Sequence, residues 1–448
     1  MSDADAGATR ERLIVFARQP RPGRAKTRLI PHLGPQGAAE IQRRMTQYIL
    51  TNLRELPRQR PASVELRLDD MPTAADQLPT AWPELELRAQ GEGDLGQRML
   101  AAFREAFAAG AERVVIIGSD CPALRPSHVA AAFDALERAD LALGPATDGG
   151  YYLIGLQEAH PRLFEDVPWG LDEALARTLK HACELGLTVK LLEDLDDIDR
   201  PEDLLAWGAE LACSTELAPP SRLSVIIPAL NEADHLADTI SRAAADGVEL
   251  IVVDGESGDE TMAVAERHGA RVLSAPAGRG FQLNTGAAAA TGGMLLFLHA
   301  DTLLPDGYLD HVRQTLARDG CVAGAFRLAL DGSSRSLRLV EKAANWRARR
   351  RQLPYGDQGL FLNAATFWRV GGFRPWPLME DVDLVRRLRL RGRIHIAPAA
   401  ALTSARRWQK KGVLRTTCLN QLLLAAYHVG VSPHTLGRLY GRRPKTGW

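Results

Sequence analysis

The chain contains few cysteines, and none of them lie close together in the sequence. The five cysteines are scattered along its length: Cys121, Cys183, Cys213, Cys321 and Cys418. Zinc modules and disulfide frameworks both need closely spaced cysteines in patterns such as C-x-x-C. We therefore exclude both kinds of scaffold and expect a protein of a reducing compartment.

The chain also lacks a net charge and a long apolar run. Lysine and arginine total 55, and aspartate and glutamate also total 55. The composition therefore gives no general attraction to nucleic acid. No apolar run is long enough to span a bilayer, and the acidic start M-S-D-A-D-A lacks the apolar segment of a signal peptide. We expect a cytoplasmic protein that binds no nucleic acid.

The length and the pattern of apolar runs predict two domains. A chain of 448 residues is too long for one core. Residues 211–222 shift to small residues and prolines, which is typical of a linker. Short apolar runs alternate with helical stretches on both sides of it. The sequence therefore predicts an α/β protein with domains at 10–210 and 223–448, each a mainly parallel sheet flanked by helices.

A basic loop follows the first expected strand, Leu13–Ala17. It reads R-Q-P-R-P-G-R-A-K-T-R-L and contains Arg24, Lys26 and Arg28. Arginine forks and backbone N–H groups both favour anions, so this loop suits a phosphate. The spacing differs from that of a Walker loop. A solvated basic loop is the alternative.

A glycine-rich stretch, Q-G-E-G-D-L-G, has the G-x-G-x-x-G spacing of dinucleotide-binding loops. It does not follow the first strand, and Glu92 and Asp94 inside it would repel a pyrophosphate. We interpret it as the turn that starts a helix over Leu95–Ala109.

Three carboxylates of the first half stand at the ends of expected strands or in glycine turns. Asp120 follows the apolar run Arg113–Gly118, and Asp148 precedes two glycines that let a ligand approach the backbone. Asp199 lies in D-I-D-R-P-E-D-L. For Asp199, a metal ligand and an ordinary helix start are equally compatible with the sequence.

These first-half motifs carry a family resemblance. V-F-A-R-Q-P-R-P-G-R-A-K-T-R-L, G-S-D-C-P, G-P-A-T-D-G-G-Y-Y-L-I-G-L and D-I-D-R-P-E-D-L resemble an uncharacterised bacterial transferase family of the GT-A fold. That family is related to phospholactate guanylyltransferase and the molybdopterin-cofactor nucleotidyltransferase, and it is labelled as an arsenosugar-biosynthesis glycosyltransferase. The resemblance implies a nucleotide-binding domain in which Asp120 and Asp199 would hold a metal.

The second half starts a new series of strands, and polar side chains end several of them. Asp254 ends the run Leu250–Val253, where its carboxylate can accept hydrogen bonds from a nucleobase. Arg279 stands between two glycines at a helix start, a natural contact for a diphosphate. The apolar run Leu295–Leu298 ends in His299-Ala300-Asp301.

Asp301 has two interpretations from the sequence. The run before it is typical of a buried parallel strand, and open α/β sheets bind ligands at the carboxyl ends of such strands. A carboxylate at that position suits a divalent metal. The alternative is that Asp301 caps the next helix. Glu380 and Asp381 also have two interpretations. They begin an expected helix, so they are either functional carboxylates or a solvated cluster that caps the helix.

The second half resembles the inverting nucleotide-sugar glycosyltransferases of the GT-A fold over about residues 222–400. The opening S-V-I-I-P-x-x-N-E is shared, which assigns Pro228, Asn231 and Glu232 to donor binding. The same resemblance implies that Asp254 binds the base and Arg279 the diphosphate.

The resemblance also implies the catalytic and metal-binding residues. His299-Ala300-Asp301 stands where the family has Asp-x-Asp, so Asp301 would ligate Mg²⁺ or Mn²⁺. His299 departs from the pattern, and imidazole could ligate manganese or contact ribose. Asp381, within Glu380-Asp381, would be the general base that deprotonates the acceptor.

Together these motifs predict a tandem transferase that moves a sugar from a nucleotide-diphosphate donor to a hydroxyl acceptor with inversion. The N-terminal domain would supply the activated sugar nucleotide. The alternatives are a second glycosyltransferase or a non-catalytic scaffold in the first half. A further alternative is a membrane-surface lipid or polysaccharide glycosyltransferase, with peripheral contact through the basic segment Arg335–Arg351 and the apolar stretch Leu419–Val431. Core packing is the other interpretation of that stretch.

Overall fold

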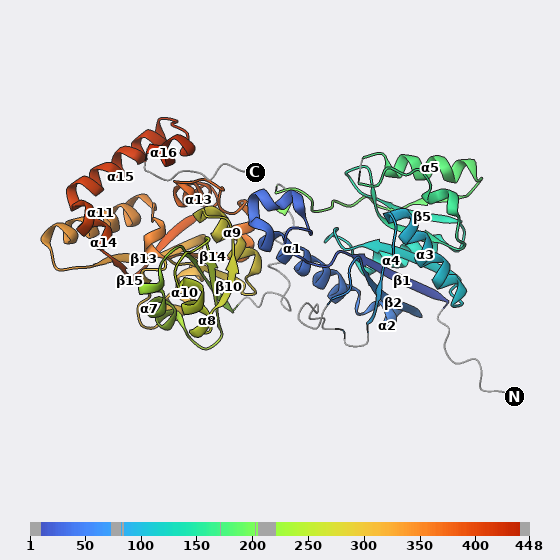
Figure 1. Ribbon diagram of the computed structural model, residues 1–448, viewed down its shortest axis with the longest axis horizontal. Coiled ribbons are helices and arrows are strands. Elements are labelled where there is room, and N and C mark those ends of the chain that lie inside the picture. The colour runs from blue at the N-terminus through green and yellow to red at the C-terminus, as the bar shows by residue number, and fades with distance from the viewer. Residues whose placement is uncertain are drawn as a thin grey trace. The chain divides into compact units, whose positions relative to one another are not determined.

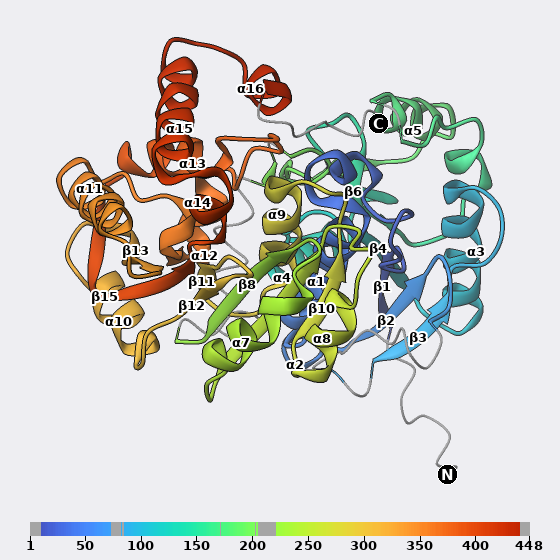
Figure 2. The same ribbon diagram turned by 60° about the vertical axis from the view of Figure 1, so that its left-hand side comes forward.

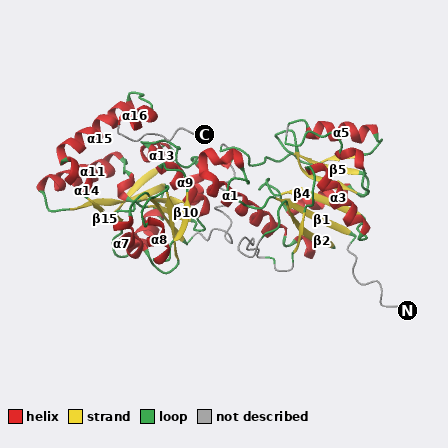
Figure 3. Cartoon of the chain, viewed as in Figure 1, coloured by secondary structure: helices red, strands yellow, loops and turns green. Residues whose placement is uncertain are grey.

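The computed structural model describes residues 10–72, 82, 85–170, 172–201, 203–204 and 221–439. The chain divides into two compact units. The first contains the residues up to Arg21 together with Gln42–Asp199, and the second contains Pro22–Ile41 together with the residues from Arg200 onward. Most of the expected linker lies outside the described residues, so its boundaries stay a prediction. Helices flank the strands in each unit (Figure 3).

The first unit is built on a seven-stranded sheet of order β3-β2-β1-β4-β6-β5-β7. The bounds of its strands and helices are β1 Glu11–Ala17, α1 Ile30–Leu53, α2 Leu56–Gln59, β2 Ala62–Leu68, β3 Glu86–Ala89, α3 Leu95–Ala108, β4 Arg113–Gly118, α4 Pro126–Ala135, β5 Leu141–Pro145, β6 Tyr151–Leu156, α5 Ala174–Glu184 and β7 Val189–Leu191. Helix α1 is kinked at Gly34 (φ 71°), and the boundary between the units falls inside this helix.

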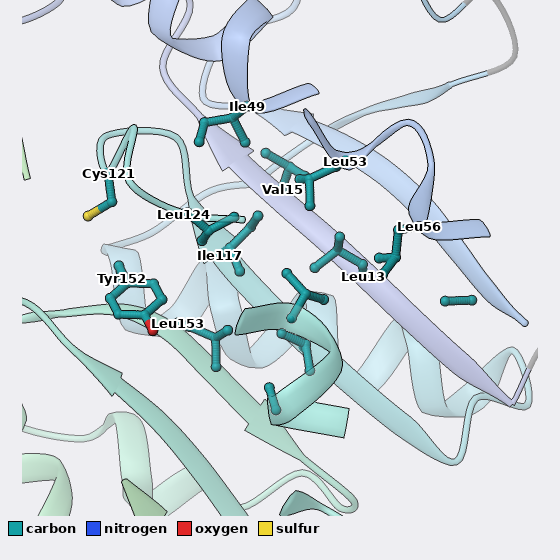
Figure 4. Packing of buried hydrophobic residues seen from close by; sticks show 14 of the residues in the cluster. Leu13, Val15, Ile49, Leu53, Leu56, Ile117, Cys121, Leu124, Tyr152 and Leu153 are labelled. Atoms are coloured by element: carbon teal, nitrogen blue, oxygen red, sulfur yellow. The ribbon is translucent and has the colours of Figure 1, made fainter. Parts of the chain in front are cut away.

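Strand β1 is buried on both faces. Leu13 and Val15 pack into one apolar cluster with Ile117 (Figure 4), whereas Ile14 and Phe16 pack into another on the opposite face. This is the pattern of a strand covered by helices on both sides, which explains its continuous apolar run. β1 pairs in parallel with β2 and β4, so these strands end at one edge of the sheet.

The second unit is built on an eight-stranded sheet of order β10-β9-β8-β11-β14-β13-β15-β12 (Figure 1). The bounds of its strands and helices are β8 Leu223–Ala229, α7 Ala233–Ala243, β9 Val248–Asp254, α8 Thr261–Arg267, β10 Arg271–Ser274, α9 Arg279–Ala289, β11 Met294–Phe297, β12 Thr302–Leu303, α10 Tyr308–Leu316, β13 Cys321–Asp331, α11 Arg335–Arg351, β14 Leu360–Asn363, α12 Ala364–Arg369, α13 Glu380–Arg389, β15 Arg393–Ser404, α14 Arg406–Lys411, α15 Val413–His428 and α16 Pro433–Leu439.

The strand that precedes His299 is buried and pairs in parallel with β8, as the sequence predicts, but its other neighbour, β14, is antiparallel. β11 pairs in parallel with β8, and β8 pairs in parallel with β9. Asp254 is the last residue of β9, and His299 and Asp301 follow the end of β11. These side chains therefore come from one edge of the sheet, where α/β proteins bind ligands.

The expected α/β class with two domains is confirmed, but the sheets are mixed. In the first unit β6 runs antiparallel to β4 and β5. In the second unit β14 runs antiparallel to β11 and β13. The alternation of strands and helices in the sequence predicts parallel pairing, and it does not reveal that β6 and β14 are inserted in the opposite direction.

The glycine-rich stretch before α3 is a helix start, as the sequence predicts. The Asp94 carboxylate accepts a hydrogen bond from the Gln97 N–H, and the Gln97 side chain accepts one from the Asp94 N–H. This is a reciprocal capping box. The expected helix after Pro201 falls partly outside the described residues.

Candidate active site

Asp254 presents an acceptor oxygen that has no partner within the described residues. Its side chain is buried, and Oδ2 accepts a hydrogen bond from the Ser257 N–H at 2.9 Å. Oδ1 is also buried and lacks a hydrogen-bond partner. Leaving a buried acceptor unsatisfied is costly. A ligand N–H group that reaches Oδ1 would therefore gain a strong hydrogen bond.

Asn231 and Pro228 shape the loop that faces Asp254. Pro228 lies on β8 opposite Val253. Asn231 has a left-handed backbone (φ 54°), and its Oδ1 accepts a hydrogen bond from the Gly258 N–H at 2.8 Å. The Asn231 N–H in turn donates to the Ser257 hydroxyl at 2.9 Å. Asn231 thus ties the loops after β8 and β9 together.

Arg279 is the first residue of α9 and lies between His299 and Glu380. One guanidinium nitrogen hydrogen bonds to Nε2 of His299, and another is 3.7 Å from the Glu380 carboxylate. Glu380 is almost fully buried. The next residue must be glycine, because a Cβ at Gly280 would lie 2.3 Å from the Arg374 carbonyl oxygen. Close packing therefore fixes the start of α9 and the place of Arg279.

Asp381 lies beside these residues and is held by the backbone of a separate loop. The Gly356 N–H donates to its Oδ2 at 2.8 Å. One small cavity of about 20 Å³ is lined by ten residues that include Arg279, His299, Glu380 and Asp381. The structure therefore brings together four of the residues that the sequence selects, from α9, α13 and the loop that follows β11.

Asp301 and Glu232 both pair with the Arg406 guanidinium, and the sequence did not indicate this residue. Arg406, at the start of α14, lies 3.3 Å from the Asp301 carboxylate and 2.6 Å from Glu232 Oε2. In the sequence Arg406 is one of many basic residues of the C-terminal region, with no local pattern to distinguish it. Arg406 reaches Asp301 only because β15, the strand that precedes α14, runs to the edge of the sheet where Asp301 lies.

Asp357 is a further carboxyl group near Asp381, and the sequence did not assign a role to it. Burial raises its pKa above the ordinary value, and the Asp381 carboxylate adds to the rise, while Arg347 and Arg279 oppose it. Its Oδ1 has no hydrogen-bond partner within the described residues. The Arg347 guanidinium lies 3.5 Å from the centre of the Tyr355 ring. A buried carboxyl with a raised pKa next to a candidate base is typical of functional sites.

The C-terminal helices support the helix that carries Asp381. Met379 and Val382 pack in one apolar cluster with Leu423 of α15 and Leu436 of α16. Figure 2 shows α15 beside α13. The apolar stretch that begins at Leu419 is therefore packed on one side against the candidate active site.

The first unit contains its own large cavity at the carboxyl end of β4. It has a volume of about 520 Å³, and its lining includes Asp120, Asp148 and Asp199. The Asp148 Oδ1 accepts a hydrogen bond from the Gly150 N–H at 2.9 Å. The three carboxylates that the sequence selects in the first half therefore face one cavity.

The basic residues selected in the first half have a different position. Arg24, Lys26 and Arg28 do not line this cavity, although Arg18 and Arg98 do. They belong to the segment Pro22–Ile41, which groups with the second unit. Their assignment to nucleotide binding stays a prediction.

Neither site holds a preformed metal cage. Within the described ranges no three histidine, cysteine, aspartate or glutamate side chains lie close enough to bind one ion. Asp301 and His299, and likewise Asp120 and Asp199, could supply one or two ligands each. A metal at either site would need further oxygen atoms from a substrate.

Two family models match the chain. The family described as an uncharacterized protein conserved in bacteria (DUF2064) matches residues 52–171, and glycosyl transferase family 2 matches residues 224–370. Phosphoenolpyruvate guanylyltransferase of Chloroflexus aggregans is 30% identical over 185 residues, which cover 39% of this chain and 88% of that protein.

Two further relatives are similar in part. An uncharacterized glycosyltransferase of Mycobacterium tuberculosis is 31% identical over 139 residues, or 30% of this chain and 63% of that protein, so less than two thirds of it is spanned. The crystal structure of a putative nucleotide-diphospho-sugar transferase from Desulfovibrio desulfuricans is 30% identical, covers 47% of this chain and 91% of that chain, and has a TM-score of 0.41.

The chain is thus a two-domain transferase. A DUF2064 domain, related to phosphoenolpyruvate guanylyltransferase, is followed in it by a family 2 glycosyltransferase domain. The predicted enzyme class is confirmed, and the link to arsenosugar biosynthesis stays a prediction. No helix among the described residues is both long and apolar enough to cross a membrane.

Proposed function

We propose that the second domain transfers a sugar from a nucleoside-diphosphate donor to a hydroxyl acceptor, with inversion at the anomeric carbon. The observation that carries this proposal is the position of Asp381. Its carboxylate lines the same small cavity as Arg279 and is oriented by the Gly356 N–H. The candidate base, Asp381, and the candidate diphosphate-binding residue, Arg279, therefore lie side by side.

The donor would bind between Asp254 and Arg279. The free oxygen of Asp254 is suited to an N–H group of the base. Arg279 would contact the diphosphate, because guanidinium groups bind phosphate oxygens through paired hydrogen bonds. His299 and Glu380 hold Arg279 in position before the donor arrives.

A divalent metal fits this site when it arrives with the donor. Mg²⁺ is usually held by one or two carboxylates together with substrate phosphates, so Asp301 need not belong to a protein cage. Asp301 would be the first ligand, with His299 as a candidate second. When bound, Mg²⁺ or Mn²⁺ would stabilise the negative charge on the leaving diphosphate.

The chain's own residues would perform the proton transfer. Asp381 would accept the proton of the acceptor hydroxyl as its oxygen attacks the anomeric carbon. Arg279 would stabilise the diphosphate that leaves on the opposite side. One displacement inverts the configuration, and no covalent enzyme intermediate is needed.

For the first domain we propose nucleotide-dependent transfer that supplies the activated sugar. The 520 Å³ cavity with Asp120, Asp148 and Asp199 supports this role, as does the similarity to a guanylyltransferase. Asp120 and Asp199 would hold a metal together with nucleotide phosphates. A second glycosyltransferase is the competing function of this cavity.

The experiment uses the whole chain with Mg²⁺ or Mn²⁺. A panel of nucleotide sugars is screened for donor hydrolysis and transfer to simple hydroxyl acceptors, and the anomeric configuration of the product is read by NMR. A retained configuration would overturn the proposed mechanism. In parallel, sugar phosphates and nucleoside triphosphates are tested for pyrophosphate release, with Asp120→Asn as the control. Absence of pyrophosphate across the panel would favour the second glycosyltransferase.

A further inference from the structure

A cationic hollow lies at the surface of the second domain, outside the site described above. It has a volume of about 380 Å³, and its lining includes Arg318, Arg349, Arg393 and His395. None of the three arginines forms an ion pair with an acidic side chain in the part of the chain that the structure describes. Nε2 of His395 is buried and has no hydrogen-bond partner there. Clustered cations without counter-charges attract an anion, and arginine forks fit phosphate oxygens.

The hollow lies at the opposite edge of the sheet from the donor site. Arg393 is the first residue of β15 and pairs with Cys321, the first residue of β13. Ala325 of β13 and Phe297 of β11 both pair with Leu360, so β13 and β11 run in the same direction. Cys321 therefore lies roughly 13 Å before the carboxyl end of β11, at about 3.3 Å per residue. The hollow is too far from His299 and Asp301 to hold the donor diphosphate.

Helix α11 continues the cationic surface and adds exposed apolar side chains. Leu339 is 68% exposed and Trp346 57% exposed. Lys342, Arg349 and Arg350 are also exposed. Leu339, Lys342, Trp346 and Arg349 follow one another at intervals of three or four residues, and Arg350 lies four residues after Trp346, so the five share one face of the helix. A soluble anion would fill the hollow but would leave this apolar face in water.

Helix α15 adds exposed apolar side chains next to α11. The two helices contact each other, and the start of α15 lies near α11, where Val413 packs with Leu337 and Ala344 (Figures 1 and 2). Leu422 is 68% exposed and Leu419 39% exposed. Apolar side chains that alternate with arginine and lysine, with a tryptophan among them, are typical of helices that lie in a membrane interface.

We propose that the outer faces of α11 and α15 dock on an anionic phospholipid bilayer, and that the hollow of Arg318, Arg349 and Arg393 takes a lipid phosphate. The observations favour a bilayer over a soluble phosphate compound because a bilayer matches both the charge and the apolar side chains. This contact is peripheral and goes beyond the proposed transfer reaction, on which it does not depend.

The test is sedimentation of the whole protein with vesicles. We expect the protein to pellet with vesicles of phosphatidylglycerol and phosphatidylcholine, but not with pure phosphatidylcholine, and to be released as the salt concentration rises. Replacing Arg349 and Arg393 with glutamine should lower the partition coefficient by roughly fivefold for each arginine. Trp346→Ser should weaken binding without changing its salt dependence.

Matched controls lie on α8, which packs beside β10 at the other end of the sheet. Arg267→Gln and Met262→Ser remove an exposed cation and an exposed apolar side chain there and should leave vesicle binding unchanged. Equal binding by the Arg349, Arg393 and Trp346 variants and by the wild type would overturn the proposal. A second result would also overturn it: inorganic phosphate stabilises the wild type but not the arginine variants, and no vesicle binds the protein. The hollow would then bind a soluble phosphate. Melting temperatures verify that each variant is folded.

Discussion

The guanidinium of Arg406 lies 3.3 Å from the carboxylate of Asp301. The candidate metal ligand is therefore already paired with a cation from the chain itself. A divalent ion that binds Asp301 must compete with this charge, or Arg406 must turn toward the incoming diphosphate. We predict that Arg406 weakens the binding of a metal by Asp301 before the donor arrives.

Replacing Arg406 with glutamine should strengthen Mn²⁺ binding in the absence of donor. A unit charge at about 4 Å contributes about 1 kcal/mol in a watery environment, which corresponds to roughly a fivefold change in affinity. Titration followed by electron paramagnetic resonance measures the free ion. Arg267→Gln, on a distant helix, is the control. An unchanged Mn²⁺ affinity would show that the metal does not bind at Asp301.

Replacing Asp381 with asparagine should abolish most transfer while leaving donor binding intact. The amide oxygen can accept only one of the two backbone hydrogen bonds that the carboxylate accepts, from the N–H groups of Gly356 and Val382, and the amide cannot accept the proton. Loss of a general base lowers the rate by about 10²–10⁴-fold. Turnover is measured by release of the nucleoside diphosphate, and donor affinity by calorimetry. If the variant loses donor affinity but keeps its turnover at saturating donor, Asp381 binds the donor and is not the base.

Asp357 makes the stability of the second domain depend on pH. Its pKa in the folded chain is raised above the ordinary value of 3.8. The neutral carboxyl group therefore contributes its full share to the free energy of unfolding below the pKa of the unfolded chain, about 3.9. This contribution is lost as the pH rises through the folded pKa. Asparagine cannot ionise, so the Asp357→Asn variant does not lose it. The variant's melting temperature should exceed the wild type's by a margin that grows from about pH 4 upward and then levels off.

Thermal scans between pH 4 and pH 9 test this prediction. The matched control is Asp306→Asn, because Asp306 is 90% exposed and its replacement should change the melting temperature little at any pH. A constant difference between Asp357→Asn and the wild type across the range would contradict the argument.

Gly286 should not tolerate a larger side chain, because α9 packs against the sheet at this residue. A Cβ there would lie 2.4 Å from Cγ2 of Ile226 and 3.1 Å from Cγ2 of Val253. Alanine favours helices by up to about 1 kcal/mol over glycine, but overpacking costs about 1–3 kcal/mol. We expect Gly286→Ala to lower the free energy of unfolding, as measured by denaturant titration. Gly118→Ala, whose Cβ would meet no atom within 4 Å, is the control.

Sequence patterns located the polar residues that end strands or begin helices. Asp254 ends β9 and Arg279 begins α9 in the structure, because apolar runs and glycines mark such boundaries locally. Strand β4 has the bounds that its apolar run predicts. These features depend on neighbours in the sequence, so the sequence alone suffices to find them.

Features that depend on distant parts of the chain were not predictable in this way. The Arg406–Glu232 pair joins residues 174 positions apart. The burial of the Asp357 Oδ1 atom depends on packing around a short loop that involves distant parts of the chain. The antiparallel insertion of β14 likewise results from pairing across the sheet. No local signal records which strands become neighbours.

The packing of α15 and α16 against Met379 and Val382 has a practical consequence for how the second domain is produced. The match to the glycosyltransferase family ends at residue 370, short of Asp381. A fragment cut there would lack the candidate base, and one cut before Val413 would expose the apolar underside of the helix that carries it. The smallest piece fit for enzymology therefore extends through α16.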